Sequence, residues 1–206
     1  MSKTLIVVLA LLALYALFLW WYGGRGKPLS QAEIVEFERL LGQLSRDTQG
    51  QSTSELVRQF AANDDGCEFV MHNLVRYRAK ALYPPGHAYG DSARDADKRY
   101  GRAVLLPLLR CGAMPIFLAR CAGRFVGPEG AAPWNYVAMV RYRSRRDFLR
   151  FAVAIESQDI AIHKWAAIEE THITPLKPLA SLIFVRAAVG GVFVLIAYVL
   201  TLLCAG

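Results

Sequence analysis

Two long apolar segments, one near each end of the chain, set the main constraint on the fold. Leu5–Tyr22 carries no charged residue. A helix rises about 1.5 Å per residue, so this segment reaches about 27 Å, enough to cross the hydrocarbon core of a membrane. At the other end, Leu179–Gly206 has one charged residue, Arg186, and the uncharged stretch Ala187–Ala205 reaches about 28 Å. The sequence therefore predicts two membrane-spanning helices that bracket one domain.

The first apolar segment has a second interpretation, as a cleaved secretory signal peptide. Lys3 would supply the positive start of such a peptide. However, the apolar run is longer than usual for a signal peptide, and it ends in Trp20, Trp21 and Tyr22 without a small-residue cleavage site. Aromatic side chains in this position are typical of the membrane interface. We favour a retained membrane span.

Basic residues near the two spans indicate the orientation of the domain. Its side of the membrane is flanked by Arg25, Lys27, Lys177 and Arg186, whereas the other side has only Lys3. The excess of Lys and Arg on one side is typical of the cytoplasm. We therefore expect a two-pass protein of the inner or plasma membrane with a cytoplasmic domain.

The charge of the chain narrows the class of partner. The net charge is +7, of which Lys3 and Arg186 account for two, so the part between the spans is basic. For a tethered domain this charge favours anionic lipid, with acidic small molecules next. No nucleic-acid-binding motif is present, so no nucleic acid partner is predicted.

The pattern between the spans predicts helices first and then a mixed α+β domain. After a hinge at Gly23–Pro28, Ser30–Glu33 and Ser52–Glu55 have the capping-box pattern that begins a helix, and the two helices would form a juxtamembrane collar. Periodicity then predicts strands over Glu68–Tyr77, Ala113–Cys121, Trp134–Tyr142 and Thr171–Leu176, and helices over Asp95–Cys111, from Ser144 onward and over Ile160–Ile168. The predicted regions are residues 1–22 (first span), 23–66 (hinge and collar), 67–177 (α+β domain) and 178–206 (second span).

The letters VRYR occur twice, at Val75–Arg78 and Val140–Arg143. The order β-α-β, β-α-β predicts a ferredoxin-like sheet, in which the first and third strands are neighbours. We expect these two strands to be parallel, so that both copies end at one edge of the sheet. A basic patch would then gather there, made of Arg76, Arg78, Arg141 and Arg143. Such a cluster needs anions nearby, from the protein's own carboxylates or from a ligand.

Several of these motifs resemble a known family. HNLVRYR at His72–Arg78, the YPPG loop at Tyr83–Gly86, the pair Tyr100-Gly101 and a late helix with His163 are similar to the dimeric α+β barrel class, and within it to the domain-of-unknown-function group numbered thirteen-thirty. The resemblance covers about residues 68–176 and neither apolar span. It implies a homodimer of ferredoxin-like βαββαβ domains with a pocket, and no particular reaction.

Five residues are candidates for binding a ligand. Asn73, in mid-strand, would either orient a ligand or bond to neighbouring backbone. An arginine fork and tyrosine hydroxyls would hold a carboxylate or phenolate, although the tyrosines would also suit packing against the sheet. The candidates are Asn73, Arg76, Tyr83, Tyr100 and His163, and we expect Arg76→Ala to abolish binding.

No cofactor or metal is predicted. The resemblance includes haem-dependent peroxidases, in which a late-helix histidine, here His163, would be the proximal ligand. Nothing else in the sequence supports haem. The four cysteines (Cys67, Cys111, Cys121 and Cys204) show no spacing typical of a zinc site or disulfide framework.

These features lead to two hypotheses about function. In the first, the domain binds a small apolar, weakly acidic molecule, with the cofactor-free monooxygenase- or isomerase-like chemistry that the resemblance implies. In the second, it is a non-catalytic assembly or regulatory subunit of a membrane complex. The interior of the domain would discriminate between them, because a cleft filled by Met71, Val75, Phe117 and Met139 would leave no room for a substrate.

Overall fold

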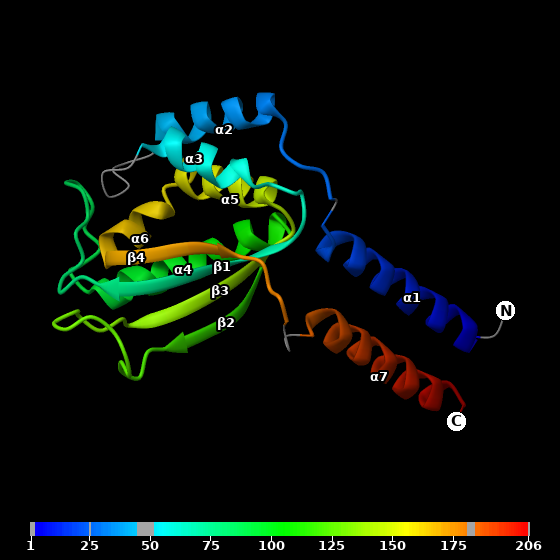
Figure 1. Cartoon of the computed structure of the whole chain (residues 1–206). Coiled ribbons are helices and arrows are strands. Elements are labelled where there is room, and N and C mark those ends of the chain that lie inside the picture. Colours follow the sequence, from blue (N-terminus) through cyan, green and yellow to red (C-terminus); the bar gives the residue numbers. More distant parts are fainter. Residues whose placement is uncertain (1–2, 25, 45–51, 181–183, 206) are drawn as a thin grey trace. The chain divides into compact units, whose positions relative to one another are not determined.

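The computed structural model describes residues 3–24, 26–44, 52–180 and 184–205 (Figure 1). It divides into two compact units. One, here called the helical pair, combines residues 1–23 with 178–206, and the other, the central unit, comprises residues 24–177. The two halves of the helical pair come from opposite ends of the chain, as expected for two apolar segments that bracket a domain.

The helical pair consists of α1 (Lys3–Tyr22) and α7 (Val185–Ala205). Each is long and apolar enough to cross a membrane, and neither apolar window is buried in the structure. The Tyr15 hydroxyl donates to the Arg186 carbonyl oxygen at 3.0 Å, and the Tyr15 and Phe193 ring centres are 5.9 Å apart. A Cβ atom at Gly190 would meet the Tyr15 hydroxyl at 3.0 Å, so a glycine is what allows this close approach.

The central unit is built on a four-stranded antiparallel sheet in the order β2-β3-β1-β4. The strands are β1 (Phe69–Tyr77), β2 (Met114–Arg120), β3 (Tyr136–Tyr142) and β4 (Ile168–Leu176). They correspond to the four predicted strands, and β4 begins earlier than expected. Their apolar and β-branched side chains alternate between the two faces of the sheet, as a strand requires.

The predicted parallel pairing of the first and third strands is wrong. β1 and β3 are neighbours, but they are antiparallel, with Val70 opposite Arg141 and Val75 opposite Tyr136. The reason is the β2–β3 connection, which reverses the chain between two adjacent strands without a crossover helix. The two VRYR copies therefore end at opposite ends of the sheet.

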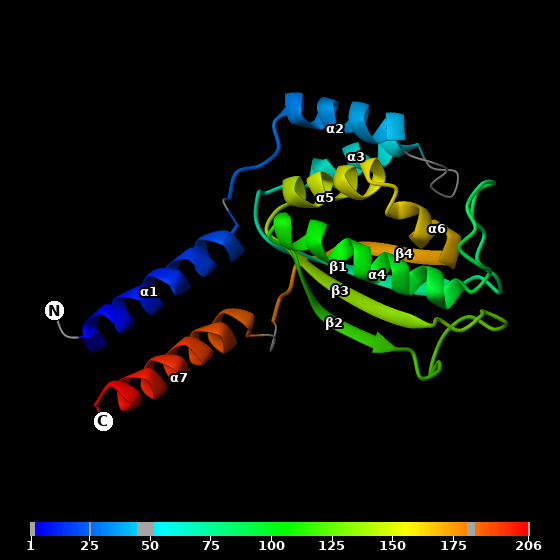
Figure 2. The same ribbon diagram turned by 180° about the vertical axis from the view of Figure 1, so that it is seen from behind.

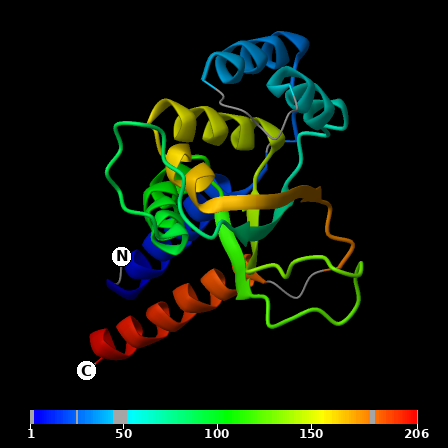
Figure 3. The same ribbon diagram turned by 90° about the vertical axis from the view of Figure 1, so that its left-hand side faces the viewer.

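Helices cover one face of this sheet. Figures 1 and 2 show α4 (Ala93–Arg110), α5 (Arg145–Ser157) and α6 (Ala161–Ala167) against it, and Figure 3 shows them on the same side when the sheet is viewed from another direction. The main core cluster lies between the two layers and includes Phe69, Met71, Val104 and Phe151.

The collar helices α2 (Gln31–Leu44) and α3 (Thr53–Ala62) pack outside α5 through a second cluster of Leu41, Val57 and Leu149. The capping box at the start of α2 is confirmed, since the Glu33 backbone N–H donates to Ser30 Oγ at 3.3 Å and the Ser30 N–H donates to Glu33 Oε2 at 2.9 Å. Ser52 is the N-cap of α3, but its side chain makes no capping bond.

The segment before α2 is held on the central unit by Arg146. Its guanidinium donates to both carboxylate oxygens of Glu33, at 2.6 and 3.1 Å, and to the carbonyl oxygens of Lys27 and Pro28 at 3.0 and 2.9 Å. These bonds, above all those from Arg146, lower the pKa of the Glu33 carboxyl to about 2. Residues 27–33 are therefore part of the packed domain.

Candidate ligand-binding site

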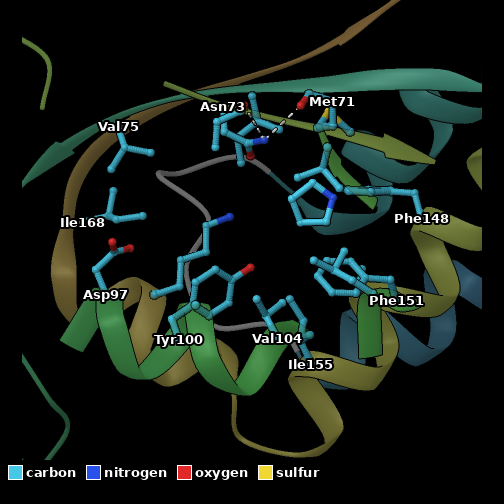
Figure 4. Close-up of a pocket in the computed structure, with 18 of the residues that line it drawn as sticks. Met71, Asn73, Val75, Asp97, Tyr100, Val104, Phe148, Phe151, Ile155 and Ile168 are labelled. Atoms are coloured by element: carbon cyan, nitrogen blue, oxygen red, sulfur yellow. Dashed lines mark hydrogen bonds between the residues drawn. The ribbon is translucent and has the colours of Figure 1, made fainter. Parts of the chain in front are cut away.

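A cavity of about 970 Å³ lies between the sheet and the helices of the central unit. Figure 4 shows Met71, Asn73 and Val75 of β1 on one side and Tyr100 and Val104 of α4 on the other. Phe148, Phe151 and Ile155 close it from α5. The three β1 residues are two positions apart, so the alternation of the strand points all of them into the cavity. Its volume is in the range of small-molecule sites, roughly 300–1,000 Å³.

Two of the predicted residues, Asn73 and Tyr100, meet in this cavity. The Asn73 amide donates through Nδ2 to the Met71 carbonyl oxygen at 3.1 Å and to that of Ala138 at 3.4 Å. Bonding to neighbouring backbone, the alternative considered for this residue, is therefore present. It uses the amide nitrogen, and the carbonyl oxygen Oδ1 is the atom left to accept a bond from a ligand.

A carboxylate and two phenols form a closed group at one end of the cavity. The Tyr77 hydroxyl donates to Asp97 Oδ2 at 2.8 Å, and the Tyr136 hydroxyl donates to Asp97 Oδ1 at 3.0 Å. Burial first, and the nearby Asp97 carboxylate next, raise the pKa of both phenols. Both phenols therefore remain protonated donors, and each oxygen of Asp97 already accepts a bond.

Lys164 of α6 also lines the cavity, and the sequence reasoning missed it. Its Nζ lies 4.9 Å from the centre of the Trp165 ring and 5.9 Å from that of Tyr100, within range of cation–π attraction. Loss of hydration lowers its pKa to about 8, against the opposing effect of the Glu156 and Asp97 carboxylates. The only sequence signal was a lysine in a short helix of apolar residues, next to the more conspicuous His163.

Arg76 does not join the cavity. It lies one residue from Val75 along β1, so its side chain points to the opposite face of the sheet. There Nε lies 3.3 Å from a carboxylate oxygen of Glu169, Nη2 lies 2.5 Å from one of Glu170, and the guanidinium stands 5.9 Å from the centre of the Trp134 ring. Alternation separates Arg76 from Asn73, so the two are not parts of one site.

Tyr83 and His163 pair with each other and do not line the cavity. The Tyr83 hydroxyl and His163 Nδ1 are 2.9 Å apart. Burial, with smaller effects of Arg99 and His87, lowers the pKa of His163, so the neutral imidazole is favoured. The same loop bonds to α6 through the Leu82 N–H, which donates to the Ala166 carbonyl oxygen at 3.0 Å. Tyr83 and His163 thus hold the helix that carries Lys164.

The predicted basic patch is not formed, because antiparallel pairing separates its members. Arg141, only 4% exposed, donates to the Gly112 carbonyl oxygen at 3.3 Å and forms an ion pair with Glu68. Arg143 donates to both carboxylate oxygens of Asp147, at 3.0 and 2.9 Å. Arg78 lies at the other end, where its backbone N–H donates to the Ala167 carbonyl oxygen at 2.9 Å. Carboxylates of the protein itself supply anions for Arg76, Arg141 and Arg143.

No group of three or more His, Cys, Asp or Glu side chains suited to a metal ion occurs within the described ranges. The lining of the cavity combines apolar walls with an amide oxygen, phenol groups, four cationic side chains and two carboxylates. Groups of these kinds are suited to binding and orienting an organic molecule.

Comparison with known proteins links this fold to solved structures. No protein-family model and no curated protein matches the chain. The chain is similar to RPA0582, a protein of unknown function from Rhodopseudomonas palustris, with a TM-score of 0.57 and 28% identity over 64% of this chain and 97% of that one. It is likewise similar to methylated RPA0582, with a TM-score of 0.57 and 29% identity over 64% of this chain and 96% of the other. About two thirds of this chain thus corresponds to nearly the whole of a protein that has been crystallised.

Proposed function

We propose that the central unit binds a small apolar, weakly acidic molecule in the cavity between its sheet and helices. The observation that carries this proposal is the open cavity of about 970 Å³. Met71, Val75 and Phe117 border this space and do not fill it. Met139 is paired with His72 and lies on the other face of the sheet. A filled interior would have argued for the assembly hypothesis, and the interior is not filled.

The charged groups around the cavity favour an anion. Four cationic side chains line it, against two carboxylates: Arg94, Lys98, Arg120 and Lys164 against Asp97 and Glu156. The Asp97 carboxylate is already bonded to two phenols. The cationic side chains would therefore attract the negative charge of a weak acid, and the apolar walls would pack against its apolar body.

The proposal includes a ferredoxin-like domain that forms a homodimer. The sheet order β2-β3-β1-β4 and the succession of strands and helices support the ferredoxin-like assignment. None of the described helices of the central unit lies over its second face (Figure 3). Membership of the dimeric α+β barrel class would explain that open face, since two such faces would cover each other.

The proposal also places α1 and α7 across an inner or plasma membrane, with the central unit in the cytoplasm. An apolar ligand concentrates in the bilayer, so a tethered domain meets it more often than a free one does. The exposed thiol of Cys67 gives a test of orientation. We expect a membrane-impermeant maleimide to label Cys67 only after the membrane is opened, and Cys67→Ser to remove that labelling. Labelling in sealed cells would place the unit outside.

The binding test is native mass spectrometry of the full-length protein released from detergent micelles. We expect a dimer that carries a reproducible small adduct. Ala138→Phe should remove the adduct, because Ala138 lines the cavity and a larger side chain would occupy it. Val137→Phe is the matched control, since the adjacent side chain of the same strand points to the other face.

The same measurement covers the alternative of an assembly or regulatory module. The exposed tip of the β2–β3 loop favours that alternative, because Phe125 is 103% exposed and Val126 84% exposed, and exposed apolar groups often mark protein contacts. If the mass spectrum shows other proteins bound to this one and no small adduct, the assembly hypothesis replaces the binding proposal. An adduct that survives Ala138→Phe would show that the ligand lies elsewhere.

A further inference from the structure

Two polar groups of the cavity wall form no hydrogen bond within the part of the chain that the structure describes. The Lys164 ammonium and the Tyr100 hydroxyl make no hydrogen bond or ion pair with any residue that the structure describes, and their contact is the approach of Nζ to the Tyr100 ring at 5.9 Å. Figure 4 shows the Tyr100 hydroxyl directed from α4 toward the interior of the cavity. Both side chains are half-buried and line the cavity, so each keeps a donor that a molecule bound there can use.

The two carboxylates that line the cavity, Glu156 and Asp97, act on the Lys164 ammonium through space and not through a hydrogen bond. Asp97 receives one phenol hydroxyl on each oxygen. Lys164 instead lies beside the aromatic rings of Trp165 and Tyr100, which attract a cation but accept no strong hydrogen bond. The pKa of Lys164, lowered to about 8 by loss of hydration, still leaves the ammonium as the main form at neutral pH. The site thus presents an ammonium group at the cavity wall with unused hydrogen-bonding capacity.

The Tyr100 phenol complements this cation. Burial raises the pKa of its hydroxyl, so it remains a donor throughout the physiological range. A carboxylate has two oxygens, and one charged donor and one neutral donor suit its single negative charge. A phosphate dianion is generally held by arginine forks or several cations, which the Lys164–Tyr100 pair does not provide.

We propose that Lys164 and Tyr100 together bind the carboxylate of an apolar monocarboxylic acid, whose body lies against the aliphatic and aromatic walls of the cavity. Val104 of α4 and Phe151 and Ile155 of α5 make up that wall near Tyr100 (Figure 4). This inference rests on the proposed function, because it names the chemical group by which the same cavity recognises its ligand. Lys164 is a binding residue here and takes part in no covalent step.

The test compares a matched acid and alcohol on the full-length protein in nanodiscs of zwitterionic lipid. The probes are 4-phenylbutanoate and 4-phenylbutan-1-ol, which share the apolar body and differ in charge. By isothermal titration calorimetry we expect the acid to bind about tenfold or more tightly than the alcohol, since a hydrogen bond to a charged group contributes this much. Lys164→Met should abolish the preference without weakening the alcohol.

Two further variants control the experiment. Tyr100→Phe removes only the hydroxyl, and should weaken the acid several-fold while leaving the alcohol unchanged. Lys80→Met removes the same charge from a residue that does not line the cavity, whose Nζ lies 3.4 Å from a carboxylate oxygen of Asp91, and should keep the preference for the acid. Unchanged thermal unfolding of each variant establishes that the fold is intact.

The possible results separate this inference from the proposed function. Equal binding of acid and alcohol, or a preference that survives Lys164→Met, overturns the role of Lys164 and leaves an apolar binding cavity. If neither probe binds, or Ala138→Phe leaves their binding unchanged, the cavity is not the ligand site and both proposals fail.

Discussion

Val75–Arg78 and Val140–Arg143 have identical sequences, yet the structure uses their arginines in different ways. The Arg76 side chain is 24% exposed and lies on the open face of the sheet beside Glu169 and Glu170. The Arg141 side chain is 5% exposed and is paired with Glu68. Because β1 and β3 are antiparallel, the two copies end at opposite ends of the sheet and meet different neighbours. A repeated motif therefore predicts repeated strand structure, and its surroundings decide what each arginine does.

The end of the sheet that contains the second copy is the more tightly packed. Arg143 binds both oxygens of Asp147, and Asp147 also accepts a bond from the Ser144 hydroxyl at 3.0 Å at the start of α5. Gly112, with a φ of +63°, lies directly beneath the Arg143 side chain. At the other end Arg76 has exposed carboxylates as partners. We therefore expect substitutions at the second-copy end to lower the free energy of unfolding more than substitutions at the first-copy end.

The largest effect is expected from Asp147→Ala. Its carboxylate is 9% exposed, and its loss leaves the Arg143 guanidinium, 17% exposed, without its bidentate partner and removes part of the α5 cap. We expect the free energy of unfolding to fall by about 3 kcal/mol in a denaturant titration. Asp95→Ala is the matched control, because Asp95 stands at the same position after the Ser92 cap of α4 but is exposed. A loss at Asp95 as large as that at Asp147 would contradict the difference between the ends.

Gly112→Ala should have the next largest effect. A Cβ atom there would lie 2.5 Å from Arg143 Nε, so the new methyl group must displace the guanidinium and also adopt a positive φ. We expect a loss of about 2 kcal/mol in unfolding free energy. Gly130→Ala has a similar φ of +72° and nothing within 4 Å, so it should cost only about 1 kcal/mol. Equal losses of unfolding free energy in the two variants would show that the Arg143 side chain moves aside without cost.

A small loss of unfolding free energy is expected from a substitution in the first VRYR copy, Val75–Arg78. Arg76→Ala removes partly exposed ion pairs and a cation–π contact with Trp134, which together contribute roughly 1 kcal/mol or less. Ligand binding should be unchanged, because Arg76 lies on the face opposite to the cavity. This replaces the expectation, drawn from the sequence, that Arg76→Ala would abolish binding. A loss of the adduct in native mass spectrometry would restore Arg76 to the site.

Acidification should produce the smallest loss of stability, through the protonation of His163 in α6. The pKa of His163 is below its ordinary value of 6.5 in the folded protein, chiefly because of burial. The unfolded chain therefore takes up this proton first, so the His163 contribution to stability is present above pH 6.5 and is lost as the pH falls below it. We expect unfolding titrations from pH 7.5 to 5 to show this decline, and His163→Gln to reduce it. A decline of the same size in His163→Gln would assign it to other groups.

Local patterns were enough to locate nearly every element. The strands β1, β2 and β3 and the helices α2 to α6 lie where periodicity and capping residues predicted them. These patterns depend on neighbours within a few residues of one another, such as Ser144 and Asp147 at the start of α5. The direction of β3 relative to β1 depends on how the β2–β3 connection turns, and residue periodicity carries no such information.

The residues of the cavity also divide into those that the sequence identified and those that only the packing of the chain revealed. Asn73 and Tyr100 were identified from the sequence as polar groups in a strand and a helix of the core, and they do line the cavity. Lys164 was missed, because a lysine is normally an exposed residue and only the packing of α6 against α4 makes it a wall of the cavity. Tyr83 and His163 were expected in the site and instead bond to each other outside it.

The sequence by itself determined the two apolar end segments and the α+β order between them, because helix length, hydrophobic periodicity and capping are properties of contiguous residues. Only the tertiary structure decided that the VRYR copies lie at opposite ends of the sheet, that Arg76 faces away from Asn73, and that Lys164 meets Tyr100 in the cavity. These relations depend on strand direction and on contacts between residues distant in the sequence, and the free energy of packing the whole chain selects them.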